Sequence, residues 1–216
     1  MRHFLGGHDE GVAAWPALAT VDAAGDREVA YRSFPEPVEQ AWYLRLQGLD
    51  PAPSDATFTI EQRLLSNPFN EPGFVWDVTQ QPNNAIPEQF RQDPSALFFE
   101  TRLDEAKVLL GAAEVRLVLA EGSQAPFQVT GILFKVDGNG RSLILSRGAV
   151  AALDEGDVAN GSVSLRFHWT KADLAPGDSL VLRLGANDAS WFMPLPANYA
   201  VTFTGHSRLS LPYFKG

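Results

Sequence analysis

The chain has 216 residues, 45% of them apolar and 20% charged, with a formal net charge of −9 at pH 7. These proportions are typical of a globular protein and exclude an intrinsically disordered one. The negative charge disfavours nucleic acid and anionic membranes as partners, because both attract Lys and Arg. No apolar run approaches the roughly 20 residues that span a bilayer, and residues 1–8 are too short and too soon polar for a signal peptide. The absence of cysteine excludes disulfides and Cys-ligated zinc, and we expect a cytoplasmic location.

The chain divides into an N-terminal segment, residues 1–26, and a domain at 27–216. Residues 2–8 read as a short strand ending in a glycine-rich turn that presents His8. The part that follows is rich in loops, because nine prolines between Pro35 and Pro94 leave little room for helices. Short strands fit between the prolines, at 27–32, 39–46 and 57–63.

The second half predicts a more regular β pattern. Two apolar runs within 129–148 flank Asp137 to Gly140, whose residues tolerate the positive φ of a tight hairpin. Apolar and polar residues alternate over 163–169. We therefore expect the four apolar residues to face a core: Val163, Leu165, Phe167 and Trp169. Further strands are expected at 114–119, at 180–184 and, as a hairpin around Gly205, at 199–211. Short strands with period-two patterning and Gly or Pro turns predict an all-β sandwich.

No motif for nucleophilic catalysis or phosphate binding is present. The Gly-x-Ser-x-Gly elbow of α/β-hydrolases does not occur, nor does a Walker loop or a dinucleotide fingerprint. The four histidines are far apart in the sequence and form no local metal motif. The acidic stretches 137–139 and 154–157 allow a calcium loop or a charged turn, and turn chemistry favours the second. We therefore expect no metal and no cofactor.

Several segments together resemble one protein family. They are 41–48, 93–101, 110–119, the hairpin 129–148 and 207–212. These segments are similar to packing and turn elements of the C-terminal, non-catalytic domain of X-Pro dipeptidyl-peptidases and cocaine-esterase-like (CocE/NonD) hydrolases. The resemblance implies a jelly-roll-like β-sandwich of the galactose-binding-domain type.

The resemblance also implies a function. In that family the sandwich packs on an α/β-hydrolase catalytic domain and helps to shape the substrate entrance. We expect the same partner here, in cis or in trans, with a homo-oligomer as an alternative assembly. Residues 1–26 would be a remnant of the catalytic domain, and His8 would stand at the position of its catalytic base. The family's catalytic Ser and Asp have no counterpart, so the chain alone should be inactive.

Aromatic residues support two further expectations. As an accessory domain, the chain should carry an apolar patch that faces its partner, around Trp15, Phe34 and Trp42. As an independent carbohydrate-binding module, it would instead bind its substrate by stacking sugar rings on Trp191 and Phe192, with Trp76 as a further candidate.

In that case the polar residues around Trp191 and Phe192 would bind the hydroxyl groups of the sugar. They are Asn187, Asp188 and Asn198. Packing inside the sandwich is the competing interpretation for Trp191 and Phe192, because Trp and Phe dominate such cores.

Overall fold

The computed structural model describes residues 18–21, 28–31, 38–45, 48–63, 86, 91, 95–186, 188 and 195–214. Its strands are β1 (Leu18–Val21), β2 (Glu28–Tyr31), β3 (Val38–Arg45), β4 (Gly48–Asp50), β5 (Thr57–Gln62), β6 (Ala96–Arg102), β7 (Lys107–Val118), β8 (Phe127–Val136), β9 (Ser142–Ala152), β10 (Ser162–Leu174), β11 (Ser179–Gly185), β12 (Tyr199–Thr204) and β13 (Arg208–Phe214). A 3₁₀ turn lies at Glu155–Asp157. No helix within the described residues is long and apolar enough to cross a membrane.

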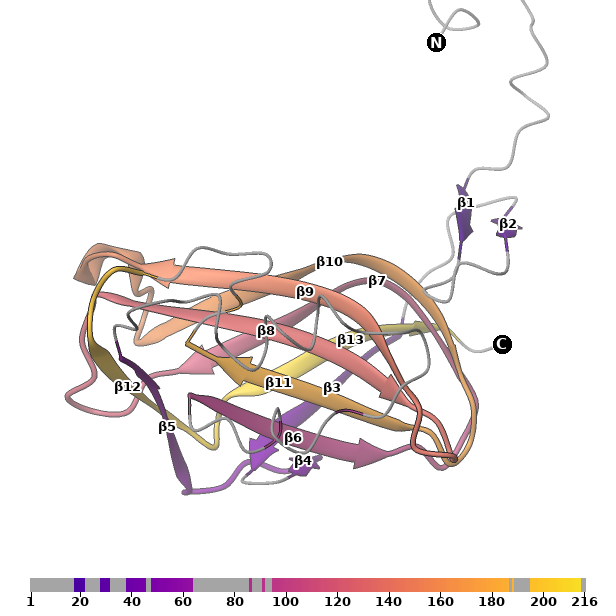
Figure 1. Ribbon diagram of the computed structural model, residues 1–216, viewed down its shortest axis with the longest axis horizontal. Coiled ribbons are helices and arrows are strands. Elements are labelled where there is room, and N and C mark those ends of the chain that lie inside the picture. The colour runs from indigo at the N-terminus through magenta and orange to yellow at the C-terminus, as the bar shows by residue number, and fades with distance from the viewer. Residues whose placement is uncertain are drawn as a thin grey trace, which may run out of the picture.

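Nine strands follow one another in the hydrogen-bonded order β4-β3-β13-β7-β10-β9-β8-β11-β6, which folds over into two layers (Figure 1). We call β4, β3, β13, β7 and β10 the five-stranded layer, and β9, β8, β11 and β6 the four-stranded layer. The layers join where β10 pairs with β9 through Phe167 and Gly148. A Cβ atom on Gly148 would lie 2.3 Å from the carbonyl oxygen of Arg166, so this corner requires glycine. The predicted all-β sandwich is confirmed.

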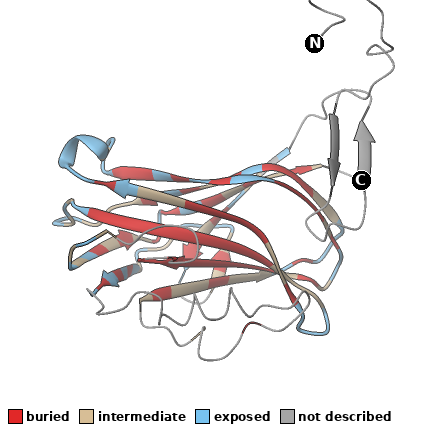
Figure 2. Ribbon diagram, turned by 45° about the horizontal axis from the view of Figure 1, so that its top comes forward, coloured by how far each residue is buried: buried red, intermediate tan, exposed pale blue. Residues whose placement is uncertain are grey.

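The hydrophobic core lies between the layers and is closed at one end by the ribbon of β5 and β12 (Figure 1). The ring centroid of Phe58 in β5 lies 5.3 Å from that of Phe99, and Phe203 in β12 lies 6.0 Å from Phe127. Both contacts are edge-on, the geometry that aromatic quadrupoles favour. Figure 2 shows buried residues along the central strands and exposed ones gathered at the turns.

The hairpin of β8 and β9 is the predicted one. Asp137 Oδ1 accepts hydrogen bonds from the backbone N–H groups of Asn139 at 2.8 Å and Arg141 at 2.9 Å. The bond from the Arg141 backbone is the main reason that the pKa of Asp137 is below its ordinary value. At the other acidic stretch, Asp154 Oδ1 accepts a bond from Gly156 N–H at 2.8 Å. Each carboxylate therefore organises its own turn, as the charged-turn interpretation predicts.

The expected register of 162–169 is correct for Val163, Leu165 and Phe167 and wrong for Trp169. The first three are 0–5% exposed, whereas Trp169 is 53% exposed. Between Arg166 and Trp169 the pairing with β7 shifts by one residue, which is a β-bulge. A bulge adds one residue to one strand and reverses the alternation after it. Trp169 therefore leaves the core.

The expected hairpin at 199–211 is also wrong in its pairing. The two strands and the turn around Gly205 exist, but β12 pairs with β5 while β13 pairs with β3 and β7. A Cβ atom on Gly205 would lie 2.6 Å from the carbonyl oxygen of Ser54, so the turn packs closely on the chain before β5. The connection therefore passes from the end ribbon to the five-stranded layer.

Candidate functional site

The residues predicted for catalysis and for stacking on sugar rings lie outside the described residues. This applies to His8, Trp76, Trp191 and Phe192, and also to Trp15 and Phe34 of the expected apolar patch. The structure does describe Trp42, Asp188 and Asn198.

Trp42 lies inside the sandwich, so its expected place on an exposed apolar patch is wrong. Its side chain is 6% exposed, and its ring contacts Tyr213 edge-on at a centroid distance of 5.7 Å. Lys107 Nζ lies 5.9 Å from the centroid of the Trp42 ring and 5.1 Å from that of Tyr213. Trp42 belongs to the inward-facing side of β3, together with Leu44.

A pocket of about 270 Å³ opens next to these rings, where β3 begins and β13 ends. In it, Lys107 Nζ donates a hydrogen bond to Gln40 Oε1 and forms an ion pair with Glu105 at 3.2 Å. Tyr213 also lines the pocket, and burial raises the pKa of its hydroxyl group. Lys107, Gln40 and Glu105 thus bind one another, whereas the Tyr213 hydroxyl group has no hydrogen-bond partner within the described residues.

The described serines and histidines form no catalytic arrangement. Ser207, next to His206, is buried, and its Oγ accepts a hydrogen bond from Val118 N–H at 2.9 Å. His168 and His206 are exposed, on β10 and on the turn before β13. Within the described ranges no three His, Cys, Asp or Glu side chains are grouped to hold a metal ion.

The outer face of the four-stranded layer is covered. Ile132 and Phe134 of β8 and Val181 of β11 point away from the main core, yet each is at most 2% exposed. Ile86 packs against them. The central strands of this layer, β8 and β11, are therefore buried on both faces along almost their whole length, which agrees with their mostly apolar sequences.

A buried ion pair lies on the same covered face. Arg147 of β9 and Arg183 of β11 are both paired with Ile132, one on each side of β8. Arg147 Nη1 donates to Asp188 Oδ2 at 2.5 Å, and their side chains are 4% and 2% exposed. Burial lowers the pKa of Arg147, and the charge of Asp188 opposes this shift. The Asp188 carboxylate thus binds Arg147, whereas the sugar-binding hypothesis expected it to bind hydroxyl groups of a sugar.

The burial of Arg147 and Arg183 was not predicted from the sequence. A signal was present, since each arginine interrupts an apolar strand, and arginine is rarely fully buried without a partner. The identity of the partner, Asp188, is visible only in three dimensions because 41 residues separate it from Arg147.

The outer face of the five-stranded layer is open. One cross-strand row on it consists of Tyr43, Arg208, Arg116 and Ser164. The next row consists of Ala41, Ser210, Glu114 and Arg166. These eight residues are exposed or half-buried. The molecule thus has one covered sheet face and one open sheet face.

A comparison with known families matches residues 11–209 to the X-Pro dipeptidyl-peptidase C-terminal non-catalytic domain. This match covers most of the chain. The chain belongs to this family. The resemblance found in the sequence is confirmed, and the domain is a non-catalytic accessory domain.

Solved structures with a similar fold are hydrolases of greater length. A CocE/NonD family hydrolase from Staphylococcus aureus superposes with a TM-score of 0.63 at 11% identity, over 99% of this chain and 44% of that one. An aminopeptidase from a marine sediment Thaumarchaeota archaeon gives 0.62 at 11% identity, over 99% and 42%. An α-amino acid ester hydrolase gives 0.66 at 12% identity, over 92% and 41%. The chain therefore spans less than half the length of these hydrolases. A search of curated proteins found no match.

Proposed function

We propose that this domain packs on an α/β-hydrolase catalytic domain, in cis or in trans, and shapes substrate access in an X-Pro dipeptidyl-peptidase or acyl-ester hydrolase. The observation that carries the proposal is the family match over residues 11–209. The similar folds within longer hydrolases are consistent with it. The proposal assigns residues 1–26, with His8, to the catalytic side of the boundary, and it places the hydrolase in the cytoplasm.

The chemistry of the described residues supports a non-catalytic role. Ser207 is held by the Val118 backbone, and the buried carboxylate of Asp188 is held by Arg147. A serine nucleophile needs a base within hydrogen-bond reach and an acid that orients the base. Ser207 and Asp188 thus serve the fold, and in the proposed function the nucleophile and the orienting acid belong to the partner.

The proposal is tested by hydrolysis assays on the purified chain and on its mixture with the separately produced catalytic domain. We expect the chain alone to leave X-Pro chromogenic dipeptides and short-chain acyl esters at the background rate. The mixture should form a complex in sedimentation experiments and show a kcat/KM that differs from that of the catalytic domain alone.

Two results would contradict the proposal. One is turnover by the chain alone that disappears when one of its serines is replaced. The other is a mixture in which neither sedimentation nor kcat/KM changes.

A further inference from the structure

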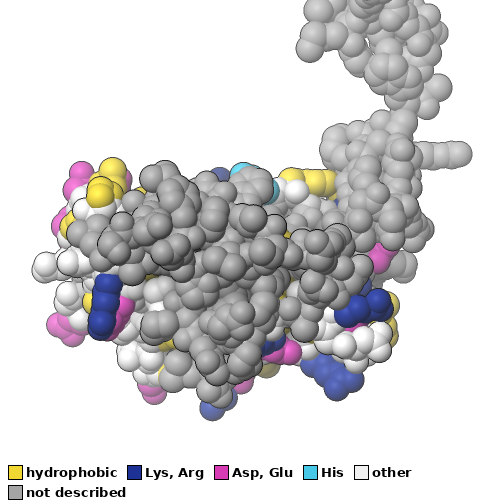
Figure 3. Space-filling view, in the orientation of Figure 1, with side chains coloured by type: hydrophobic (Ala, Val, Ile, Leu, Met, Phe, Trp, Pro, Cys, Tyr) yellow, Lys and Arg dark blue, Asp and Glu magenta, His cyan; other side chains and the backbone are white. Residues whose placement is uncertain are grey.

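The two outer sheet faces differ in whether the chain itself covers them. On the four-stranded layer, Ile132, Phe134 and Val181 are at most 2% exposed. On the five-stranded layer, the residues at equivalent outward positions, such as Arg116, Arg166 and Arg208, are exposed. A partner that packs against a sheet therefore has the second face available. Figure 3 views the molecule from the side of the four-stranded layer and shows basic and acidic side chains interspersed around the rim.

The open face carries a pair of arginines that lie opposite each other. Arg208 of β13 and Arg116 of β7 are direct cross-strand partners, and Tyr43 of β3 is the next residue in the row. Arg116 Nε donates to Ser162 Oγ at 3.3 Å, and neither guanidinium forms an ion pair within the described residues. Like charges directly opposite each other on a sheet are unfavourable. An external carboxylate would relieve this repulsion.

The two acidic residues described on the same face, Glu114 and Asp50, are already paired. Glu114 accepts a hydrogen bond from Ser164 at 2.8 Å and forms an ion pair with Arg166 at 3.4 Å. Asp50 forms an ion pair with Arg45 at 3.1 Å. Within the described residues, the positive charge at Arg116 and Arg208 is thus not compensated by an acidic side chain, in a protein whose net charge is −9.

The β-bulge in β10 adds an aromatic ring to this side of the molecule. Trp169 is 53% exposed, and its Nε1 would lie 3.9 Å from a Cβ atom on Gly111. Pro212 of β13 borders the same glycine. The open face therefore combines Tyr43, Trp169 and two arginines, the residue types that are enriched in the energetically dominant parts of protein interfaces.

We propose that the domain docks on the catalytic domain of its own hydrolase through the open face of the five-stranded layer, with Trp169 as an apolar anchor and carboxylates of the partner bound to Arg116 and Arg208. This inference rests on the proposed function, because it names the surface that the partner contacts. The chain also enters the sandwich through β3 of this layer, so an N-terminal catalytic domain would be tethered next to it. A two-fold dimer whose axis passes at Arg116 and Arg208 would bring these arginines against their own copies, which disfavours a second copy at this place.

Hydroxyl-radical footprinting of the isolated chain and of the intact hydrolase tests the surface. Trp169 and Tyr43 should be oxidised in the isolated chain and protected in the intact hydrolase. Leu153, which directly follows the last residue of β9, is 62% exposed and should be labelled equally in the isolated chain and in the intact hydrolase. Protection of another surface, with Trp169 and Tyr43 unprotected, would overturn this inference and leave the proposed function intact. Equal labelling everywhere would overturn the proposed function itself.

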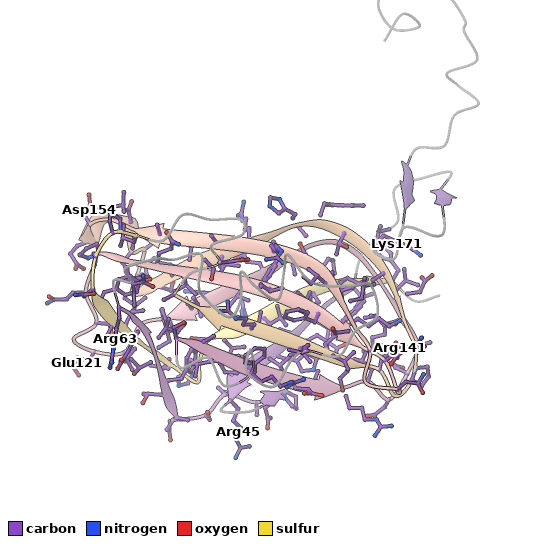
Figure 4. All side chains as sticks on the ribbon, in the orientation of Figure 1. Arg45, Arg63, Glu121, Arg141, Asp154 and Lys171 are labelled. Atoms are coloured by element: carbon purple, nitrogen blue, oxygen red, sulfur yellow. The ribbon has the colours of Figure 1, made fainter. Side chains whose placement is uncertain are left out.

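Charge reversal tests the arginines. We expect Arg116→Glu with Arg208→Glu to weaken binding of the separately produced catalytic domain about tenfold or more, with a reduced dependence on salt. Arg63→Glu is the matched control, because Arg63 is 85% exposed and lies at the β5 end of the sandwich (Figure 4). The control should change the Kd less than about twofold, as single surface charges typically do. Equal weakening by both variants, or by neither, would overturn the assignment of the arginines.

Discussion

Tyr199 and Tyr213 both place a hydroxyl group in the protein interior, but only one hydroxyl is hydrogen-bonded. Tyr199 donates to the carbonyl oxygen of Gln128 at 2.5 Å and lies 3.2 Å from that of Ala186, which ties β12 to the ends of β8 and β11. The hydroxyl group of Tyr213 is buried without a hydrogen-bond partner in the described structure. A buried polar group without a partner loses its bonds to water and gains nothing in return.

The two tyrosines therefore predict opposite effects of removing the hydroxyl. Tyr199→Phe should lower the free energy of unfolding by about 0.5–1.5 kcal/mol, because it breaks a partly buried hydrogen bond. Tyr213→Phe should leave it unchanged or raise it by about 1 kcal/mol. Urea unfolding of the two variants measures both changes. A larger loss for Tyr213→Phe than for Tyr199→Phe would contradict the hydrogen-bond assignment.

Tyr199 also predicts a loss of stability at alkaline pH. Burial raises the pKa of Tyr199 to about 12, against an ordinary value of 10.0. Above pH 10 the unfolded chain releases this proton while the folded protein keeps it, so the free energy of unfolding falls from pH 10 to about pH 12. Well below pH 10 Tyr199 is protonated in the folded and in the unfolded protein, so it does not contribute to the pH dependence of the free energy of unfolding.

Urea midpoints at pH 8, 10 and 11 measure this effect. The decline above pH 10 should be smaller in Tyr199→Phe than in the unchanged protein. Parallel declines in the two proteins would show that Tyr199 ionises at the same pH in the folded and unfolded states.

At the scale of elements, β10 shows how one inserted residue redirects a strand. Its alternate residues face the core up to Phe167, which pairs with Gly148 of β9. Two residues later, the side chain of Trp169 is exposed to solvent. The bulge lies at the corner between the two layers, where a strand must bend. The same bend produces the exposed ring of the open face.

Because of the bulge, we expect Trp169 to contribute less than Phe167 to the free energy of unfolding, although Trp has the larger side chain. Phe167→Ala should cost about 3–5 kcal/mol, because it removes a buried ring and leaves a cavity. Trp169→Ala should stay within about 0.5 kcal/mol, as for other surface substitutions. Denaturant midpoints of the two variants of the isolated chain decide this. A cost for Trp169→Ala equal to that for Phe167→Ala would place Trp169 in the core and remove the bulge.

At the scale of the whole molecule, the two layers have different surroundings. The central strands β8 and β11 of the four-stranded layer are buried on both faces, and the layer contains the Arg147–Asp188 ion pair on its outer side. The five-stranded layer has one face on the core and one face open. This asymmetry leaves one sheet face available to a partner. It explains why β8 and β11 are buried along almost their whole length, whereas buried and exposed residues alternate in β10 before the bulge.

The sequence by itself determined the fold class, the β8–β9 hairpin and the family. Each depends on local information: period-two patterning, turn residues with known φ preferences, and short segments typical of the family. The absence of a nucleophile elbow was equally readable, because that motif is contiguous in the chain.

Only the tertiary structure decided the exposure of Trp169, the burial of Trp42, the separation of β12 from β13 and the pairing of Arg147 with Asp188. Each depends on which strands lie next to each other, and partners such as Thr204 and Thr57 are far apart in the chain. A single-residue bulge leaves no mark in the apolar pattern, yet it reverses the direction of the side chains that follow. Burial of a charge depends likewise on a partner that folding brings from a distant part of the sequence.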